Sequence, residues 1–448
     1  MKELVTIVLP LIIVFYFPMF GKVIPVISSL PYNFINYSLL SMLIFTLLPL
    51  VLNRNFEKID GRLTPLIVFN LYIIANQVLK GLFLGSLMNY INATSGVILS
   101  TLIILFFSQL RQFGRSKRLF DTIATTLAIM LFLQVLLSLI ESASGTLLGD
   151  YEISKRADGS SIIVSAAGRD LLTLFGLSQK DLFGLEIAFT GLIGQHNAFG
   201  IMLVFYNVFF LAQYEKNRNK YRLLPCLLII IALIGNGTRS AIFIVLLTDF
   251  LYIFFLIKNK MLKISAAFLL VLPLTLILKN GLYGSIIKWY YQSDSLTSRL
   301  LLWKQLPLMP KDLFSFLFGK TIQDISLWII KIGEVVKVSF ESEFFNLYLK
   351  TGFIGMLLFL CMLLQIYRIK SFRYLRVKII SNRLLVLNIC FVSFFMTGII
   401  HYTTYTLITL IILYYLHQDI MFSEHAKVKN IDLPCDRFSC LSQFDHVS

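Results

Sequence analysis

Two glutamates stand where the chain passes from a long polar segment into an apolar run. A helix beginning near Glu341 would place Glu343, Asn346 and Lys350 on one face. A carboxylate at such a boundary can take the proton from a substrate hydroxyl, which is general base chemistry. Acidic residues are also favourable at any helix N-terminus, without a catalytic role. Glu343 is the leading candidate for a base and Glu341 the second.

An arginine stands in a glycine-rich turn between two apolar runs. Arg239 follows Gly235-Asn236-Gly237-Thr238 and precedes Ser240. Its guanidinium is permanently charged and presents a fork that matches phosphate oxygens. The glycines allow the backbone to turn tightly beside it. This setting favours an anion-binding role over an arginine that merely extends to a membrane interface.

The polar segment 279–343 carries more cations and all three tryptophans of the chain. Arg299 and Trp303 are four residues apart, so a helix there would place a cation beside an aromatic ring that can stack on a sugar. Lys304 follows directly. The same residues would also suit a solvated surface with an aromatic belt at the membrane interface. Concentration of the tryptophans in one segment favours the stacking role modestly.

Polar side chains also interrupt two apolar runs. His196 and Asn197 lie within the run 183–213, and Asp249 lies near the middle of 241–257. Ionisable groups inside a membrane span are functional candidates by default. Glycines flank the first group, so helix packing explains it equally well. Asp249 is expected to be neutral or paired with a polar neighbour.

The composition shows which elements must hold these residues. Of 448 residues, 57% are hydrophobic and only 14% are charged, whereas about a quarter of a soluble domain is charged. The sequence therefore predicts an all-α polytopic membrane protein. A span needs roughly 20 apolar residues, and the apolar runs suggest about twelve spans, of which the seventh and twelfth are short: 4–20, 36–52, 63–79, 93–110, 119–140, 183–213, 223–234, 241–257, 264–278, 344–367, 384–400 and 404–416.

Lysine and arginine crowd the short connections on one side of this arrangement, namely 53–62, 111–118, 214–222, 258–263 and 368–383. The positive-inside rule places them in the cytoplasm with both termini, and places 141–182 and the large loop 279–343 outside. This orientation accounts for the net charge of +16, so no nucleic-acid partner is expected. We predict one transmembrane domain, 1–416, and a mobile cytoplasmic tail, 417–448.

No nucleotide-binding motif and no convincing metal site occur in the sequence. Cys435, Cys440 and His446 are poorly spaced for zinc. We therefore expect neither a metal nor a cofactor.

Four motifs, in order, resemble the O-antigen polymerase and ligase superfamily over roughly 183–367. They are GQHNAFG, GNGTRSAIF, SRLLLW and ESEFFNLYLKTGFIGMLLFL. The resemblance implies a helical fold of the glycosyltransferase C type in the bacterial cytoplasmic (inner) membrane. It also implies metal-independent transfer of glycans carried on undecaprenyl pyrophosphate, with a flippase and a chain-length regulator as partners.

The resemblance favours the polymerase branch, which joins repeat units into O-antigen, capsule or exopolysaccharide. Ligases typically end the large loop with a His-Asn pair, whereas 279–343 contains no histidine and ends in Glu341 and Glu343. Arg239, Arg299 and Lys304 would stabilise the leaving pyrophosphate. Trp303, His196 and Asn197 would contact substrate. The alternatives are a ligase acting on an acceptor such as lipid A-core, and a transporter of lipid-linked oligosaccharide. A transporter would usually show an internal repeat, and none is found.

Overall fold

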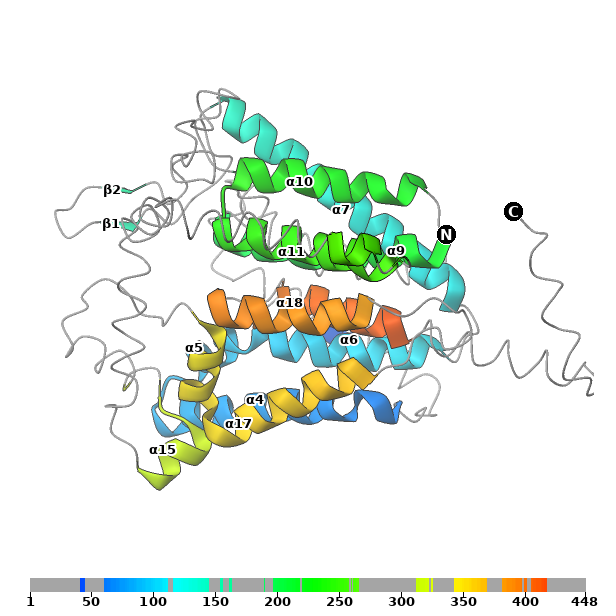
Figure 1. Ribbon diagram of the computed structural model, residues 1–448. Coiled ribbons are helices and arrows are strands. Elements are labelled where there is room, and N and C mark those ends of the chain that lie inside the picture. The colour runs from blue at the N-terminus through cyan, green and yellow to red at the C-terminus, as the bar shows by residue number, and fades with distance from the viewer. Residues whose placement is uncertain are drawn as a thin grey trace, which may run out of the picture.

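The computed structural model of the chain is helical (Figure 1). It describes residues 41–44, 60–111, 116–144, 154–155, 161–162, 189, 196–217, 220–257, 259, 261–265, 312–321, 324, 342–368, 381–396, 399–400 and 404–416. The predicted spans 4–20, 36–52 and 264–278 lie wholly or largely outside these residues, as does the tail 417–448. Most of the predicted loops 141–182 and 279–343 also lies outside them.

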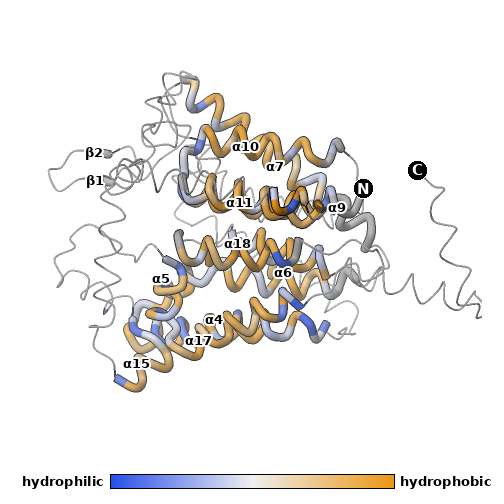
Figure 2. The backbone as a smooth tube through the Cα atoms, in the orientation of Figure 1, coloured by the Kyte–Doolittle hydropathy of each residue, from blue (hydrophilic) through white to orange (hydrophobic). Residues whose placement is uncertain are grey.

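Four described helices are long and apolar enough to cross a membrane: Gly61–Phe83, Ile123–Ala143, Asn197–Tyr214 and Glu343–Arg368. Shorter apolar helices accompany them within the described ranges. In Figure 2 hydrophobic residues run along most of the helices, and hydrophilic residues gather toward several of their ends. The predicted helical membrane fold is thus confirmed in its coarse form.

The helices begin and end near residues that their sequences favour. Pro65 lies in the first turn of α4 and Pro225 in that of α10, where a missing N–H costs nothing. Gly237 ends α10 in the left-handed conformation. The elements are α4 (Thr64–Phe83), α5 (Leu87–Ala93), α6 (Ser95–Arg111), α7 (Ser116–Ser144), α9 (His196–Asn217), α10 (Leu224–Asn236), α11 (Arg239–Leu256), α15 (Leu313–Phe318), α17 (Glu343–Arg368), α18 (Ser381–Phe395) and the helix Thr404–Leu416.

Short 3-10 turns, η2 (Gly61–Leu63) and η5 (Lys220–Leu223), precede α4 and α10. The only strands among the described residues are β1 (Ser154–Lys155) and β2 (Ser161–Ile162), which pair antiparallel. Figure 1 shows this pair on the same side of the molecule as α5 and α15.

Two helices form the centre of the bundle. In α9, 89% of Asn197–Tyr214 is buried, against 44% of each of the other three long apolar helices. Every residue of Thr404–Leu416 is buried. The two helices touch through Phe209 and Tyr414, whose ring centroids are 5.2 Å apart. Figure 1 shows α10 and α7 above the layer of α9 and α11, and α4 and α17 below the layer of α18 and α6.

A hydrogen-bonded network joins α4 and α6 to the helix Thr404–Leu416. The Tyr405 hydroxyl donates to Asn70 Oδ1 (2.7 Å), and Asn70 Nδ2 donates to Ser100 Oγ (3.2 Å). Ser100 Oγ in turn lies 2.6 Å from Thr409 Oγ1. Since all four side chains are buried, this pairing avoids the cost of unsatisfied polar groups and fixes the relative position of the three helices.

The prediction of one continuous span over 183–213 is wrong at its start. Helix α9 begins at His196, so His196 opens the helix and does not lie inside it. Phe189 is non-helical. Its N–H donates to Gly235 O (2.9 Å) and its carbonyl accepts from Asn236 Nδ2 (2.7 Å). Pairing with the end of α10 therefore satisfies the backbone that a continuous helix would have satisfied internally.

Candidate functional site

Two motifs that lie about 40 residues apart in the sequence meet in the structure. Gly200, in the first turns of α9, faces the turn between α10 and α11. A Cβ atom on Gly200 would lie 2.9 Å from Asn236 Oδ1 and 3.0 Å from Thr238 Cβ. A side chain at this position would force the Asn236 and Thr238 side chains to shift, so glycine favours this close approach. The starts of α9 and α11 are therefore neighbours.

Asn236 holds the turn that leads into α11. Besides donating to Phe189 O, its side chain accepts from the Thr238 N–H (3.3 Å). Gly237 between them has φ +68°. The predicted tight turn beside Arg239 is thus confirmed, and Arg239 becomes the first residue of α11.

This end of the bundle suits an anion. His196 and Arg239 are the first residues of α9 and α11. The first turn of a helix presents free N–H groups and the positive end of the dipole. Asn197 is exposed there, while the side chains of His196 and Arg239 lie outside the described part of the structure. Two adjacent helix starts can bind phosphate oxygens.

Glu343 is the first residue of α17, as its sequence setting predicts. Its side chain is 8% exposed, and its backbone N–H donates to Met396 O (3.1 Å) at the end of α18. Ser342 Oγ donates to Ser393 O (3.1 Å) beside it. Asn346 is also buried but Lys350 is exposed. Of the three residues expected on one helix face, only Glu343 and Asn346 therefore share a buried environment.

Helix α17 is broken two turns after Glu343. Gly352 has φ 70° and ψ −168°, a backbone conformation that essentially only glycine adopts. At the break, α17 lies directly against α15. The two glycines allow this approach, since a Cβ on Gly352 would collide with Leu317 O and one on Gly319 with the backbone of Lys350. The Lys320 N–H donates to Leu349 O (2.6 Å). The segment 342–352 is therefore held at both ends.

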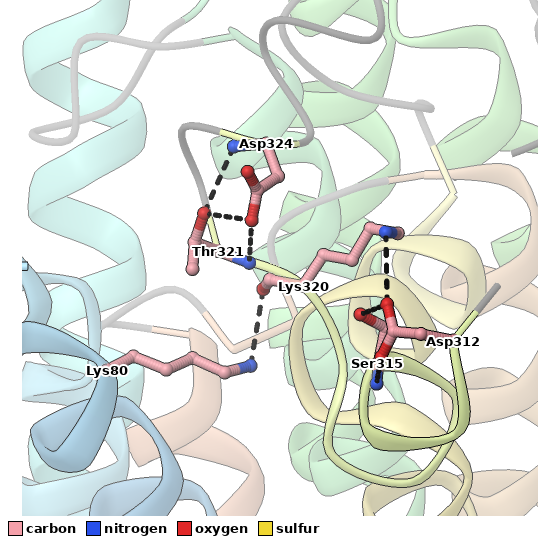
Figure 3. Close-up of polar contacts among 6 residues, drawn as sticks. All are labelled: Lys80, Asp312, Ser315, Lys320, Thr321 and Asp324. Carbon is pink, nitrogen blue, oxygen red and sulfur yellow. Dashed lines mark hydrogen bonds and ion pairs between the residues drawn. The ribbon is translucent and has the colours of Figure 1, made fainter. Parts of the chain in front are cut away.

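A buried lysine connects α4 to the place where α15 meets the break in α17. Lys80 Nζ, in the last turn of α4, donates to the carbonyls of Phe318 (2.9 Å), Lys320 (3.2 Å) and Lys350 (2.6 Å). We call these three acceptors the carbonyl cage. Figure 3 shows Lys80 reaching Lys320, with Asp324 beyond it. An ammonium group is favourable here because the ends of α15 and of the first part of α17 present free carbonyls.

Neighbouring side chains of α4 strengthen the same contact. Asn76 Nδ2 donates to Phe318 O (2.8 Å), and Gln77 Nε2 donates to Lys350 O (3.1 Å). The Tyr72 hydroxyl donates to Thr351 O (2.6 Å). This stripe was not predicted from the sequence. The signal that could have found it is the polar spacing 72, 76, 77 and 80 inside an apolar run.

Replacing Lys80 by Met is expected to lower the thermal stability of the detergent-solubilised protein. The Lys320 carbonyl loses its described partner, at a cost of about 1–3 kcal/mol. The other two cage carbonyls keep Asn76 and Gln77. Fluorescence-detected size exclusion after heating measures the change. Leu79→Met is the control, because Leu79 is 54% exposed. Equal melting temperatures for the two variants would contradict the role given to Lys80.

Asp249 is paired with a polar neighbour, one of the two states expected for it. Asn207 Nδ2 on α9 donates to Asp249 Oδ1 on α11 (2.7 Å). The preceding residue of α11, Thr248, donates its Oγ1 hydroxyl to Asn388 Oδ1 on α18 (2.7 Å). These bonds join α9, α11 and α18 within the bundle. They explain the polar residues as helix contacts.

Glu341, Arg299, Trp303 and Lys304 lie outside the described residues. Of the predicted site, the structure brings the His196 and Arg239 motifs together. It places Glu343, the first residue of α17, beside the end of α18, and α18 packs against both α9 and α11. No group of three metal-ligating side chains occurs in the described ranges. The chain matches no protein-family model, and comparison with curated proteins finds no relative.

Proposed function

We propose that this chain polymerises oligosaccharide repeat units carried on undecaprenyl pyrophosphate into a bacterial surface polysaccharide. The proposed enzyme is a metal-independent glycosyltransferase of the cytoplasmic membrane. In full it has about twelve spans, a fold of the glycosyltransferase C type and cytoplasmic termini. Its site faces outward.

One observation carries this proposal. The starts of α9 and α11 lie side by side through Gly200, Asn236 and Thr238. The arrangement places two helix N-termini, together with the backbone of Arg239, at one end of the bundle. A pyrophosphate diester is an anion that such an end can bind without a metal. The order of the sequence motifs supplies the second support.

The reaction needs a base and an anion site. The acceptor hydroxyl oxygen forms a bond to the anomeric carbon of the donor glycan, while the bond from that carbon to the pyrophosphate oxygen breaks. The leaving undecaprenyl pyrophosphate keeps the electron pair. Arg239, Arg299 and Lys304 offset its charge. The hydroxyl proton passes to Glu343, with Glu341 in reserve, and Trp303, His196 and Asn197 hold the sugars.

Arg239→Ala is expected to lower polymer formation by purified protein about 100- to 1,000-fold, the effect typical of losing one group that stabilises transition-state charge. Arg239→Lys should form polymer at a rate between those of the wild type and Arg239→Ala, because lysine keeps the charge but loses the bidentate fork. The assay follows chain length from lipid-linked repeat units in nanodiscs. Arg383→Ala is the matched control, since Arg383 lies in the first turn of α18, away from its end beside Glu343.

Three outcomes separate the candidate functions. Long chains made at the normal rate by Arg239→Ala would overturn the proposed anion site. Transfer of single units to a lipid A-core acceptor, without chain growth, would identify a ligase. Movement of the lipid-linked units across the bilayer without any new glycosidic bond would identify a transporter.

A further inference from the structure

Three large apolar side chains project from one end of the bundle. Leu313 and Phe314 of α15 are 76% and 67% exposed, and Phe83 in the last turn of α4 is 89% exposed. We call these three residues the interfacial patch. Large apolar side chains left exposed at one end of the bundle indicate contact with another apolar phase.

The interfacial patch is held rigidly. The end of α15 is fixed to α4 by Lys80 and Asn76, which both donate to Phe318 O. The start of α15 is capped by Asp312, whose side chain accepts from the Ser315 N–H (2.6 Å) and hydroxyl (2.6 Å). Those hydrogen bonds from Ser315 lower the pKa of Asp312. Leu313 and Phe314 therefore belong to a helix whose two ends are fixed by hydrogen bonds, and not to an irregular loop.

The interfacial patch continues two apolar faces of the bundle. Exposed residues of α4 and α17 recur at helical spacing, as on helix faces that contact lipid: Val68, Leu71, Leu79 and Leu82 on α4, and Phe353, Leu357, Leu360 and Leu364 on α17. Phe316 of α15 stacks on Phe353 with ring centroids 5.6 Å apart. The apolar face of α17 thus passes without interruption onto α15.

Charged groups lie at both ends of α15. Asp312 and Asp324 are exposed, and Lys320 Nζ lies 4.0 Å from Asp312 Oδ2. Figure 3 shows Asp312 beside Ser315 at the start of α15, and Lys320 and Asp324 on the chain that leaves this helix. An apolar surface bordered by charges of both signs fits the boundary between acyl chains and headgroups.

We propose that α15 is a membrane-interface element, with Leu313, Phe314 and Phe83 inserted among the acyl chains just below the lipid headgroups. The occupant of the surface is bilayer lipid, because the patch continues the lipid-facing sides of α4 and α17. The described part of the polar segment 279–343 is therefore anchored to the membrane surface at the break in α17. This assignment does not depend on the polymerase proposal.

Fluorescence quenching in nanodiscs tests it. The full chain, with its natural cysteines replaced, carries a single cysteine-linked fluorophore at Phe314→Cys or Leu313→Cys. Leu357→Cys on α17 serves as the lipid reference and Asp324→Cys as the water reference. Phospholipid with a nitroxide on the upper acyl chain is expected to quench both α15 labels as strongly as the Leu357 label. Aqueous iodide should quench them several-fold less than the Asp324 label.

Two results would overturn the proposal. Iodide quenching of the α15 labels equal to that at Asp324 would mean that the patch faces water. Protection from both quenchers would mean that protein covers it. Use of both positions guards against a local effect at Phe314, whose ring packs against Phe318, whereas Leu313 is the more exposed of the two.

Discussion

Glu343→Gln is expected to lower the rate of polymer formation about 100- to 10,000-fold, the usual contribution of a positioned general base. Glutamine keeps the size and hydrogen-bonding capacity of the side chain but cannot take the proton of the acceptor hydroxyl. Glu343 lies on a segment that is held at Met396 and at the carbonyl cage. We therefore expect its replacement to change the rate and not the folding. Turnover of lipid-linked repeat units by purified protein measures it.

Two comparisons make the test of Glu343 specific. Asp324→Asn removes an exposed carboxylate of the same large loop and should leave the rate unchanged. Glu341→Gln should have the smaller effect of the two glutamate variants. Normal turnover in both, with normal donor binding, would reduce the pair to acidic residues at a helix start. The search for a base would then turn to His196 or Asp249.

Gly352→Ala is expected to destabilise the fold severely. Its φ of 70° and ψ of −168° lie in a region that costs other residues about 1–3 kcal/mol. The added methyl group would also collide with the backbone at Leu317, so the loss should exceed that range. Straightening the helix instead would pull Lys350 and Thr351 away from Lys80, Gln77 and Tyr72. The yield of monodisperse protein after solubilisation, and its melting temperature, report the change.

Gly61→Ala is the matched control for Gly352. A Cβ there has nothing within 4 Å and requires no positive φ. If Gly352→Ala matched Gly61→Ala in yield and melting temperature, the break in α17 would not be a fixed feature of the fold.

Helices were predicted well where an apolar run is bounded by a glycine or a polar residue. The run 223–234 corresponds to α10 almost residue for residue, because hydrophobicity and a following glycine act locally. The run 404–416 is helical over all its residues. The start of α9 was misplaced. The backbone at Phe189 pairs with Gly235 and Asn236, and no local pattern reveals a partner more than 40 residues away.

The candidate site was predictable in its parts and not in its assembly. The glycine turn before Arg239 and the helix start at Glu343 follow from residue type. The contact of Gly200 with Asn236 depends on how α9 packs, and so does the partner of Asp249. The break at Gly352 was not predicted, because Gly352 lies inside the run 344–367, which was interpreted as one continuous span. Lys80 was overlooked because one lysine at the end of an apolar run resembles an ordinary interface residue.

The central position of α9 sets a timing problem for biosynthesis. Its buried amides Asn207 and Gln213 lie in a helix flanked by α18 and by Thr404–Leu416, and the latter begins about 190 residues after α9 has been made. At roughly 5–20 residues per second, the ribosome needs about 10 to 40 s to reach it. During that interval α9 has α10 and α11 on one flank only. Its other flank must be sheltered by the insertion machinery or by lipid until the last helices arrive.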